Sequence, residues 1–206
     1  MNIFKDPIYI INLKHRVDRK EFVIKQLEEF DITNYEFFNA VNTFGNDALK
    51  SGELGCLLSH LELIKLAKEK KLPYITILED DALFIPNFKN IYKKAIKEVP
   101  DNFDLFYIGS IQAIQPTMKK LIGVCNFSLT TVGYVINSTI YDKVIELLSR
   151  QSDTVDFIYA RCIQPNKKSY CAYPSLLEQK SGYSDILEKD VDYSLYYNKE
   201  LNQMIQ

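Results

Sequence analysis

The 206-residue sequence has no tryptophan, seven glycines and only two histidines, His15 and His60. Two histidines cannot form a histidine-rich metal centre, which argues against zinc catalysis. The common phosphate-loop, dinucleotide, serine-hydrolase and zinc-protease motifs are also missing: G-x-x-x-x-G-K-S/T, G-x-G-x-x-G, G-x-S-x-G and H-E-x-x-H. The chemistry that is left must use carboxylates, backbone donors, arginine and a hard cation.

Neither sign of charge is in large excess. Lysine plus arginine number 25 and aspartate plus glutamate 27, a net charge of -2 at pH 7, so nothing favours a nucleic-acid partner. No stretch approaches the ~18 consecutive apolar residues of a transmembrane helix, and residues 1–7 lack the apolar core of a signal peptide. We therefore expect a cytoplasmic protein without a membrane span, whose contact with a membrane, if any, is peripheral.

The four cysteines, Cys56, Cys125, Cys162 and Cys171, are scattered and show no C-x-x-C spacing. In a chain without an export signal, this spacing favours free thiols in a reducing compartment over disulfides.

Apolar runs of strand length alternate with helical stripes of apolar residues. We expect strands over residues 8–13, 35–41, 74–78, 104–108 and 127–136, and helices over residues 18–30, 55–71, 87–99, 138–149 and 153–162. Residues 111–126 show weak periodicity and are expected to form a loop. The alternation predicts an α/β fold with a mostly parallel central sheet, and the length suits a single domain over residues 1–206.

The most informative stretch is the apolar strand that ends in Glu79, Asp80 and Asp81. Open α/β sheets bind ligands at the carboxyl ends of their strands. Two charges ~5 Å apart repel by roughly 3 kcal/mol at an effective dielectric near 20, and a divalent cation such as Mn²⁺ or Mg²⁺ would remove that cost. The alternative is a solvated acidic turn, but residues 82–85 are apolar again. If the chain stays extended, Glu79 and Asp81 share one face and Asp80 takes the other.

Several further segments accompany this triplet in a recognisable order. They read Ile-Ile-Asn-Leu-Lys-His-Arg-Val-Asp-Arg (10–19), Tyr-Glu-Phe-Phe-Asn-Ala-Val (35–41), Gly-Glu-Leu-Gly-Cys-Leu-Leu-Ser-His (52–60) and Leu-Glu-Asp-Asp (78–81). This series resembles glycosyltransferase family 25, which includes bacterial lipooligosaccharide galactosyltransferases and collagen galactosyltransferases. Later pieces at 131–136, 155–156, 174–179 and 184–186 extend the resemblance over residues 8–186, leaving a tail at 187–206.

The resemblance implies a GT-A-like nucleotide-sugar-binding domain, a UDP-sugar donor, Mn²⁺ or Mg²⁺ dependence and inversion at the anomeric carbon. It carries the main metal-binding role to Asp81, with Glu79 assisting. Many GT-A enzymes complete the metal site with a late histidine, and no histidine follows His60. Asp185, Gln179 or water would have to take that place.

The expected donor site begins after the first strand with Asn12, Arg16 and Arg19, because the rigid donor fork of arginine suits a diphosphate. The alternative is that both arginines lie exposed on the following helix, paired with Asp18 or Glu21. Glu79 and Asp80 are expected to contact the donor as well.

Ala40, at the end of the second strand, is a candidate contact for the base or ribose. Ser59 and His60 are candidates to touch the donor or to hold a loop beside it, although a lone histidine is more often structural. Gly52 and Gly55 would permit a tight turn or a close backbone approach to the donor.

Asp156 is the candidate general base, because an inverting transfer needs a carboxylate near the acceptor hydroxyl. It lies late in the chain, where GT-A folds bind the acceptor. The alternative is an acid at a helix N-terminus, favoured by the helix dipole, and Asp153 is the nearest rival.

The expected function is transfer of a hexose, galactose first, from a UDP-sugar to a hydroxyl of a glycan acceptor such as lipooligosaccharide. Three alternatives stay open: a nucleotide-sugar-binding protein without turnover, transfer to hydroxylysine of a collagen-like protein, and metal-dependent phosphoester hydrolysis. The last leaves the segments 12–19 and 52–60 without a role.

Overall fold

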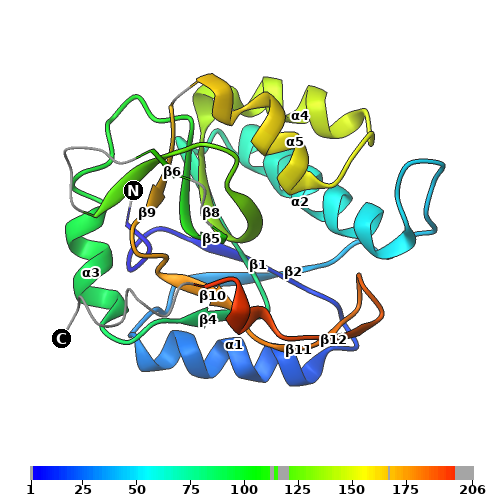
Figure 1. Cartoon of the computed structure of the whole chain (residues 1–206), viewed down its shortest axis with the longest axis horizontal. Helices are drawn as coiled ribbons and strands as arrows, with labels where there is room; N and C mark the ends of the chain where they lie inside the picture. Colours follow the sequence, from blue (N-terminus) through cyan, green and yellow to red (C-terminus); the bar gives the residue numbers. More distant parts are fainter. Residues whose placement is uncertain (1, 112–113, 116–120, 167, 198–206) are drawn as a thin grey trace.

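An eight-stranded mixed sheet lies at the centre of the computed structural model, which describes residues 2–111, 114–115, 121–166 and 168–197 (Figure 1). In spatial order its strands are β2 (Tyr35–Asn39), β1 (Ile8–Asn12), β3 (Tyr74–Glu79), β8 (Leu129–Asn137), β5 (Leu105–Ile111), β9 (Ser169–Ala172), β7 (Ile122–Cys125) and β6 (Ile114–Gln115). Six strands run in one direction, and β7 and β8 run against them. The predicted α/β fold with a mostly parallel sheet is confirmed.

Helices cover both faces of this sheet, and Figure 1 shows the two groups on opposite sides. One group is α2 (Ser51–Glu69), α4 (Tyr141–Ser149) and α5 (Val155–Cys162), and the other is α1 (Val17–Glu29) and α3 (Phe88–Ala95). Along β1, Tyr9 and Ile11 join the core under the first group, whereas Ile8 and Ile10 join the core under the second. Burial on both faces explains why the strands are continuous apolar runs.

Helix α2 begins at Ser51, one turn earlier than predicted. The carboxylate of Glu53 accepts the Lys50 N–H at 2.9 Å, which satisfies one free amide at the helix start. Gly52 and Gly55 therefore lie inside the helix and make no turn. A Cβ on Gly55 would lie 2.6 Å from the Val41 carbonyl oxygen, so the close approach is to another segment of this chain.

The middle of the chain differs from the prediction in detail. Part of the expected loop at 111–126 forms β7, β6 and the end of β5, and residues 112–113 and 116–120 lie outside the described structure. The expected strand at 127–136 is β8, which lies between β3 and β5 and is antiparallel to both.

Short elements from late in the chain complete the fold. The strand β4 (Ala82–Phe84) pairs with β10 (Leu177–Gln179), and β11 (Gly182–Ser184) forms a hairpin with β12 (Lys189–Val191). Three 3-10 helices span Ser138–Ile140, Gln164–Asn166 and Tyr193–Leu195. Because β4 directly follows the acid triplet, its pairing with β10 brings the C-terminal segment to the carboxyl end of β3.

All four cysteines are free thiols. Within the described ranges, no helix combines the length and the apolar character needed to cross a membrane.

Candidate active site

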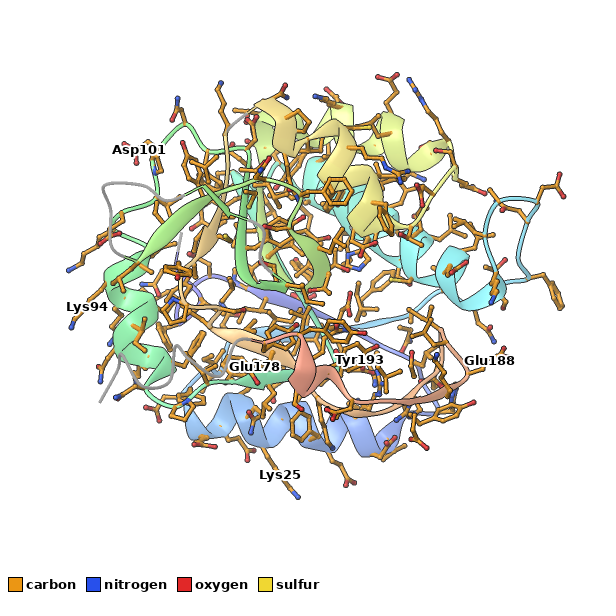
Figure 2. The ribbon with its side chains drawn as sticks, in the orientation of Figure 1. Lys25, Lys94, Asp101, Glu178, Glu188 and Tyr193 are labelled. Carbon is orange, nitrogen blue, oxygen red and sulfur yellow. The ribbon has the colours of Figure 1, made fainter. Side chains whose placement is uncertain are left out.

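A pocket of about 310 Å³ lies at the carboxyl ends of β1, β2 and β3, the edge where parallel strands place ligands. Its wall includes ten residues singled out from the sequence: Arg19, Ala40, Gly52, Gly55, His60, Glu79, Asp80, Asp81, Gln179 and Asp185. Glu188 and Tyr193, labelled in Figure 2, add side chains from the C-terminal segment around β11 and β12. Segments more than 100 residues apart thus form one concave surface.

The acid triplet is not extended, because β3 ends at Glu79 and the chain turns at Asp80 and Asp81. The condition under which Glu79 and Asp81 would share one face is therefore not met. Arg19 Nη1 donates to Asp80 Oδ1 at 3.1 Å and to Asp81 Oδ2 at 3.3 Å. Asn12 Nδ2 donates to Asp80 Oδ2 at 2.7 Å. The turn groups the two aspartates around one guanidinium and separates them from Glu79.

Of the three acids, Asp81 has the ionised form that this site disfavours most. Burial, followed by repulsion from Glu79, raises its pKa to about 7, although Arg19 opposes the change. Burial also raises the pKa of Asp80. Asp81 Oδ1 is buried and has no hydrogen-bond partner among the described residues. This oxygen is buried, has no donor among those residues, and lies on a residue next to a second carboxylate, Asp80. Such a pair suits a hard divalent cation, which binds oxygen ligands.

Glu79 has different partners on the opposite side of the turn. Its Oε1 accepts the Thr131 hydroxyl at 2.6 Å and lies 3.4 Å from His60 Nε2. Burial acts to raise the pKa of Glu79, but His60 and Thr131 together hold it below its ordinary value. Next to this pair lies Cys56, and burial raises the pKa of its thiol well above the ordinary value.

Asp185 enters the pocket from the β11–β12 hairpin, forms an ion pair with Arg16, and has its Oδ1 3.6 Å from His15 Nε2. Arg16 also binds Asp18 through two hydrogen bonds of 2.8 and 2.9 Å, the pairing expected in the alternative reading of this arginine. In addition, Arg19 Nη2 donates to the Tyr183 carbonyl at 2.8 Å. The two arginines therefore fasten the hairpin to the start of α1.

Ser59 is fully buried and holds the loop after β2 against α2. Its hydroxyl accepts the Val41 N–H at 2.8 Å and donates to the Gly55 carbonyl at 2.7 Å. On the same loop, the Ala40 N–H donates to the Asn12 carbonyl at 2.9 Å. Ser59 thus positions two pocket residues, Ala40 and Val41, and is itself outside the pocket lining as far as the structure describes it.

Asp156 lies in the first turn of α5 and, of the residues described, is not among those that line the pocket. It accepts the Thr154 hydroxyl at 2.6 Å and the Thr130 N–H at 3.3 Å. Thr130, which donates to Asp156, precedes Thr131, whose hydroxyl binds Glu79, so Asp156 lies beside the part of β8 that contacts the pocket residue Glu79. The rival Asp153 forms an ion pair with Arg161.

Sequence reasoning missed Cys56, Thr131 and Tyr134. The Tyr134 hydroxyl lies 2.6 Å from His60 Nδ1 and fixes the buried imidazole. Cys56 precedes His60 by four residues, the spacing of neighbours on one helix face, so its place beside His60 could have been found. Thr131 and Tyr134 lie in a segment that was noted only for its resemblance, and no local pattern identifies their partners.

Comparisons with known proteins agree with this geometry. The family model described as Glycosyltransferase family 25 (LPS biosynthesis protein) matches residues 5–128. Procollagen galactosyltransferase 1-A of Xenopus laevis is 28% identical over 164 residues, covering 64% of this chain and 26% of that protein. Putative glycosyltransferase R655 of Acanthamoeba polyphaga mimivirus is 33% identical over 121 residues, covering 50% of this chain and 36% of that protein.

The chain spans about a quarter to a third of the length of these two relatives. Among solved structures, a glycosyltransferase involved in glycosylation of the major capsid of PBCV-1 aligns with a TM-score of 0.47 and 12% identity, over 78% of this chain and 77% of that one. The mixed α/β sheet, with acids at the end of β3, is the GT-A-like architecture that the resemblance implies. With more than half of its length matched by the family model, the chain belongs to glycosyltransferase family 25.

Proposed function

We propose that this chain is the catalytic domain of an inverting glycosyltransferase that moves galactose from a UDP-sugar to a hydroxyl of a glycan acceptor. One observation carries the proposal. Asp81 is buried at the carboxyl end of β3 inside the pocket, and its Oδ1 has no donor in the described part of the chain. Family membership and the relatives' names support transfer of a sugar, and galactose in particular.

Asp81, with Asp80 beside it, would hold Mn²⁺ or Mg²⁺. When bound, such an ion neutralises charge on the departing diphosphate, a contribution of several kcal/mol in metal-assisted transfers. Asp185 is a third candidate ligand because it lines the same pocket, although it must then give up part of its pairing with Arg16. Glu79 would assist through ribose or water contacts.

The remaining pocket residues would bind and orient the donor. Arg19 has its guanidinium at the wall, so its donors would meet the diphosphate. Asn12 orients Asp80 through its 2.7 Å hydrogen bond. Ala40 and Val41 line the wall on a loop held by Ser59, where a base or ribose would pack. Arg16 would act indirectly, because its partners Asp18 and Asp185 fix it between α1 and the hairpin.

Asp156 would take the proton from the acceptor hydroxyl as that oxygen attacks the anomeric carbon. Asp156 accepts hydrogen bonds from the Thr154 hydroxyl and from the Thr130 and Phe157 N–H groups, so the carboxylate is held as an acceptor, as a base requires. The acceptor is either a glycan of the lipooligosaccharide type, which the family description favours, or hydroxylysine of a collagen-like protein, which the procollagen relative favours.

A second candidate function is nucleotide-sugar binding without turnover. It is favoured by Arg19, which already occupies both aspartates, and by the position of Asp156 outside the described pocket lining. Both functions predict donor binding, so only turnover separates them.

The test is a panel of UDP-sugars with Mn²⁺, read as thermal stabilisation and as UDP release with and without acceptor. A donor at 100-fold its Kd should stabilise the fold by ~2.7 kcal/mol. Acceptor-dependent UDP release supports the transferase, and stabilisation without release supports the binding protein. Phosphate release without acceptor would instead identify a phosphoester hydrolase, and no response to any UDP-sugar would overturn the proposal.

A further inference from the structure

A second cluster of metal-ligating atoms lies on the inner wall of the pocket, apart from the Asp80–Asp81 pair. It consists of Cys56, His60 and Glu79, whose ligand atoms all lie within 4.8 Å of one another. Cys56 and His60 are four residues apart on α2, so they project from the same helix face. Glu79 ends β3 and supplies a carboxylate from the sheet side. All three residues line the pocket, which gives an ion a path of entry.

His60 has the contacts expected of a metal-ligating histidine. The imidazole is fully buried. Its Nδ1 lies 2.6 Å from the Tyr134 hydroxyl, so the contact that usually sets the tautomer of a ligating histidine is present. Its Nε2 is buried on the Glu79 side and has no hydrogen-bond partner in the described structure. The ring is held from behind by Tyr134, and its Nε2 faces Glu79 Oε1 at 3.4 Å without a hydrogen bond, so a cation bound by both atoms would satisfy this buried nitrogen.

We propose that Cys56, His60 and Glu79 form a binding site for Zn²⁺ or a similar borderline cation, with water from the pocket in the fourth position. A thiolate, an imidazole and a carboxylate are the ligands that zinc takes, whereas Mn²⁺ and Mg²⁺ prefer oxygen alone. With bonds of about 2.0–2.3 Å, a tetrahedral zinc site places its ligand atoms roughly 3.3–3.8 Å apart. The ligand atoms of the three side chains, no more than 4.8 Å apart, would have to move closer by up to about 1.5 Å to reach that spacing. On binding, the Cys56 thiol loses its proton to solvent.

The two sites are distinguished by what surrounds Glu79. Thr131 and His60 turn this carboxylate away from Arg19, which binds only Asp80 and Asp81 of the triplet. Glu79 thus belongs to the zinc site and not to the hard-cation site that the sequence predicts for it. The proposal does not depend on sugar transfer, because it is read from binding alone.

The probe is Co²⁺, added to the reduced, chelator-treated full chain without donor. Tetrahedral cobalt bound to a thiolate gives strong visible bands and a near-ultraviolet charge-transfer band, whereas cobalt bound to carboxylates gives neither. We expect the thiolate bands to saturate at one equivalent per chain. Zn²⁺ should displace the cobalt, because it binds nitrogen and sulfur ligands more tightly.

Cys56→Ser should abolish the charge-transfer band and weaken binding at least ~100-fold, more than the 10–100-fold expected for the supporting variant Tyr134→Phe. Cys162→Ser is the matched control, because this thiol is exposed at the end of α5, and it should leave the titration unchanged. Asp81→Asn should also keep the band, which separates this site from the hard-cation site.

Circular dichroism must show that Cys56→Ser is folded. If that variant does not fold, Glu79→Gln provides the test, with the band retained and the affinity lowered. A wild-type protein without a thiolate band overturns the proposal, and the 3.4 Å approach of His60 Nε2 to Glu79 is then a contact within the protein alone. So does a band that survives in folded Cys56→Ser.

Discussion

Asp81 has one buried carboxylate oxygen without a donor in the described structure, and repulsion from Glu79 adds to its burial. Asp81→Asn keeps the side-chain shape and removes one of three adjacent charges. The metal-free protein should therefore be at least as stable as wild type. Sugar transfer should fall at least ~100-fold, the loss of a main electrostatic contact of ~2.7 kcal/mol.

Thermal unfolding and UDP release measure the two effects of Asp81→Asn. The control is Asp101→Asn, an exposed residue labelled in Figure 2 that lies outside the pocket and should change neither value. A folded Asp81→Asn protein that transfers sugar at a near-normal rate at low Mn²⁺ would remove Asp81 from the site.

Substitution of Asp156 should affect the chemical step and leave donor binding unchanged. Asp156→Asn should lose turnover and keep Mn²⁺-dependent UDP binding, because a general base acts in the chemical step and hardly affects donor affinity. Calorimetry with UDP and a turnover assay provide the two readouts. Asp153→Asn is the contrast, since Asp153 pairs with Arg161. If Asp153→Asn abolishes turnover and Asp156→Asn does not, the base is the rival residue.

Residue positions were easier to predict than residue contacts. An apolar run that ends in three acids implies a sheet edge, and Glu79, Asp80 and Asp81 do line the pocket there. Their separate hydrogen-bond partners could not be predicted. The turn after Glu79 depends on the pairing of β4 with β10, in which Phe84 lies opposite Leu177, 93 residues later in the chain. The place of Cys56 beside His60 follows from their spacing, but the approach of Glu79 could not be predicted because it comes from another element.

At the scale of elements, α2 and the loop after β2 act together through Ser59. Ser59→Ala leaves the half-buried Val41 N–H without its hydroxyl acceptor, which should cost ~1–3 kcal/mol in the free energy of unfolding. Because the loop carries Ala40 and Val41 into the pocket, KM for the donor should also rise. Urea unfolding and donor kinetics test both, with exposed Ser149→Ala as the control. A change in neither value would contradict the role given to Ser59.

Strands and helices with a clear apolar pattern could be predicted from the sequence, but the order of the strands in the sheet could not. The strands β1, β2 and β3 follow from apolar runs and from the helices between them, since β-α alternation implies parallel neighbours. The period of a strand does not say which strand lies beside it. The insertion of β8 between β3 and β5 is fixed by contacts across the sheet, such as Leu78 opposite Gly133, and no sequence window contains both.

At the scale of the whole molecule, Leu177 attaches the C-terminal segment to the sheet. It is fully buried, and the missing Cβ atoms of Gly109 and Gly133 leave the room it occupies. Leu177→Ala should lower the free energy of unfolding by ~2–5 kcal/mol and loosen β10. Donor KM should rise as well, because Gln179, Asp185 and Tyr193 reach the pocket through this segment.

Chemical denaturation and donor kinetics measure the outcome for Leu177→Ala. Leu187→Ala is the matched control, a leucine 48% exposed on the same segment. Equal effects of the two substitutions would mean that β10 does not anchor the pocket wall.

The pairing of β10 with β4 also sets an order of events during synthesis. The chain leaves the ribosome N-terminus first at about 5–20 residues per second, so Leu177 emerges roughly 5–20 s after its partner Phe84. Until then Leu177 covers neither the apolar face of β4 nor, once Gly109 and Gly133 have emerged, the groove beside them. The nascent chain is therefore most exposed to chaperones and to misassociation just before the pocket of the candidate active site closes.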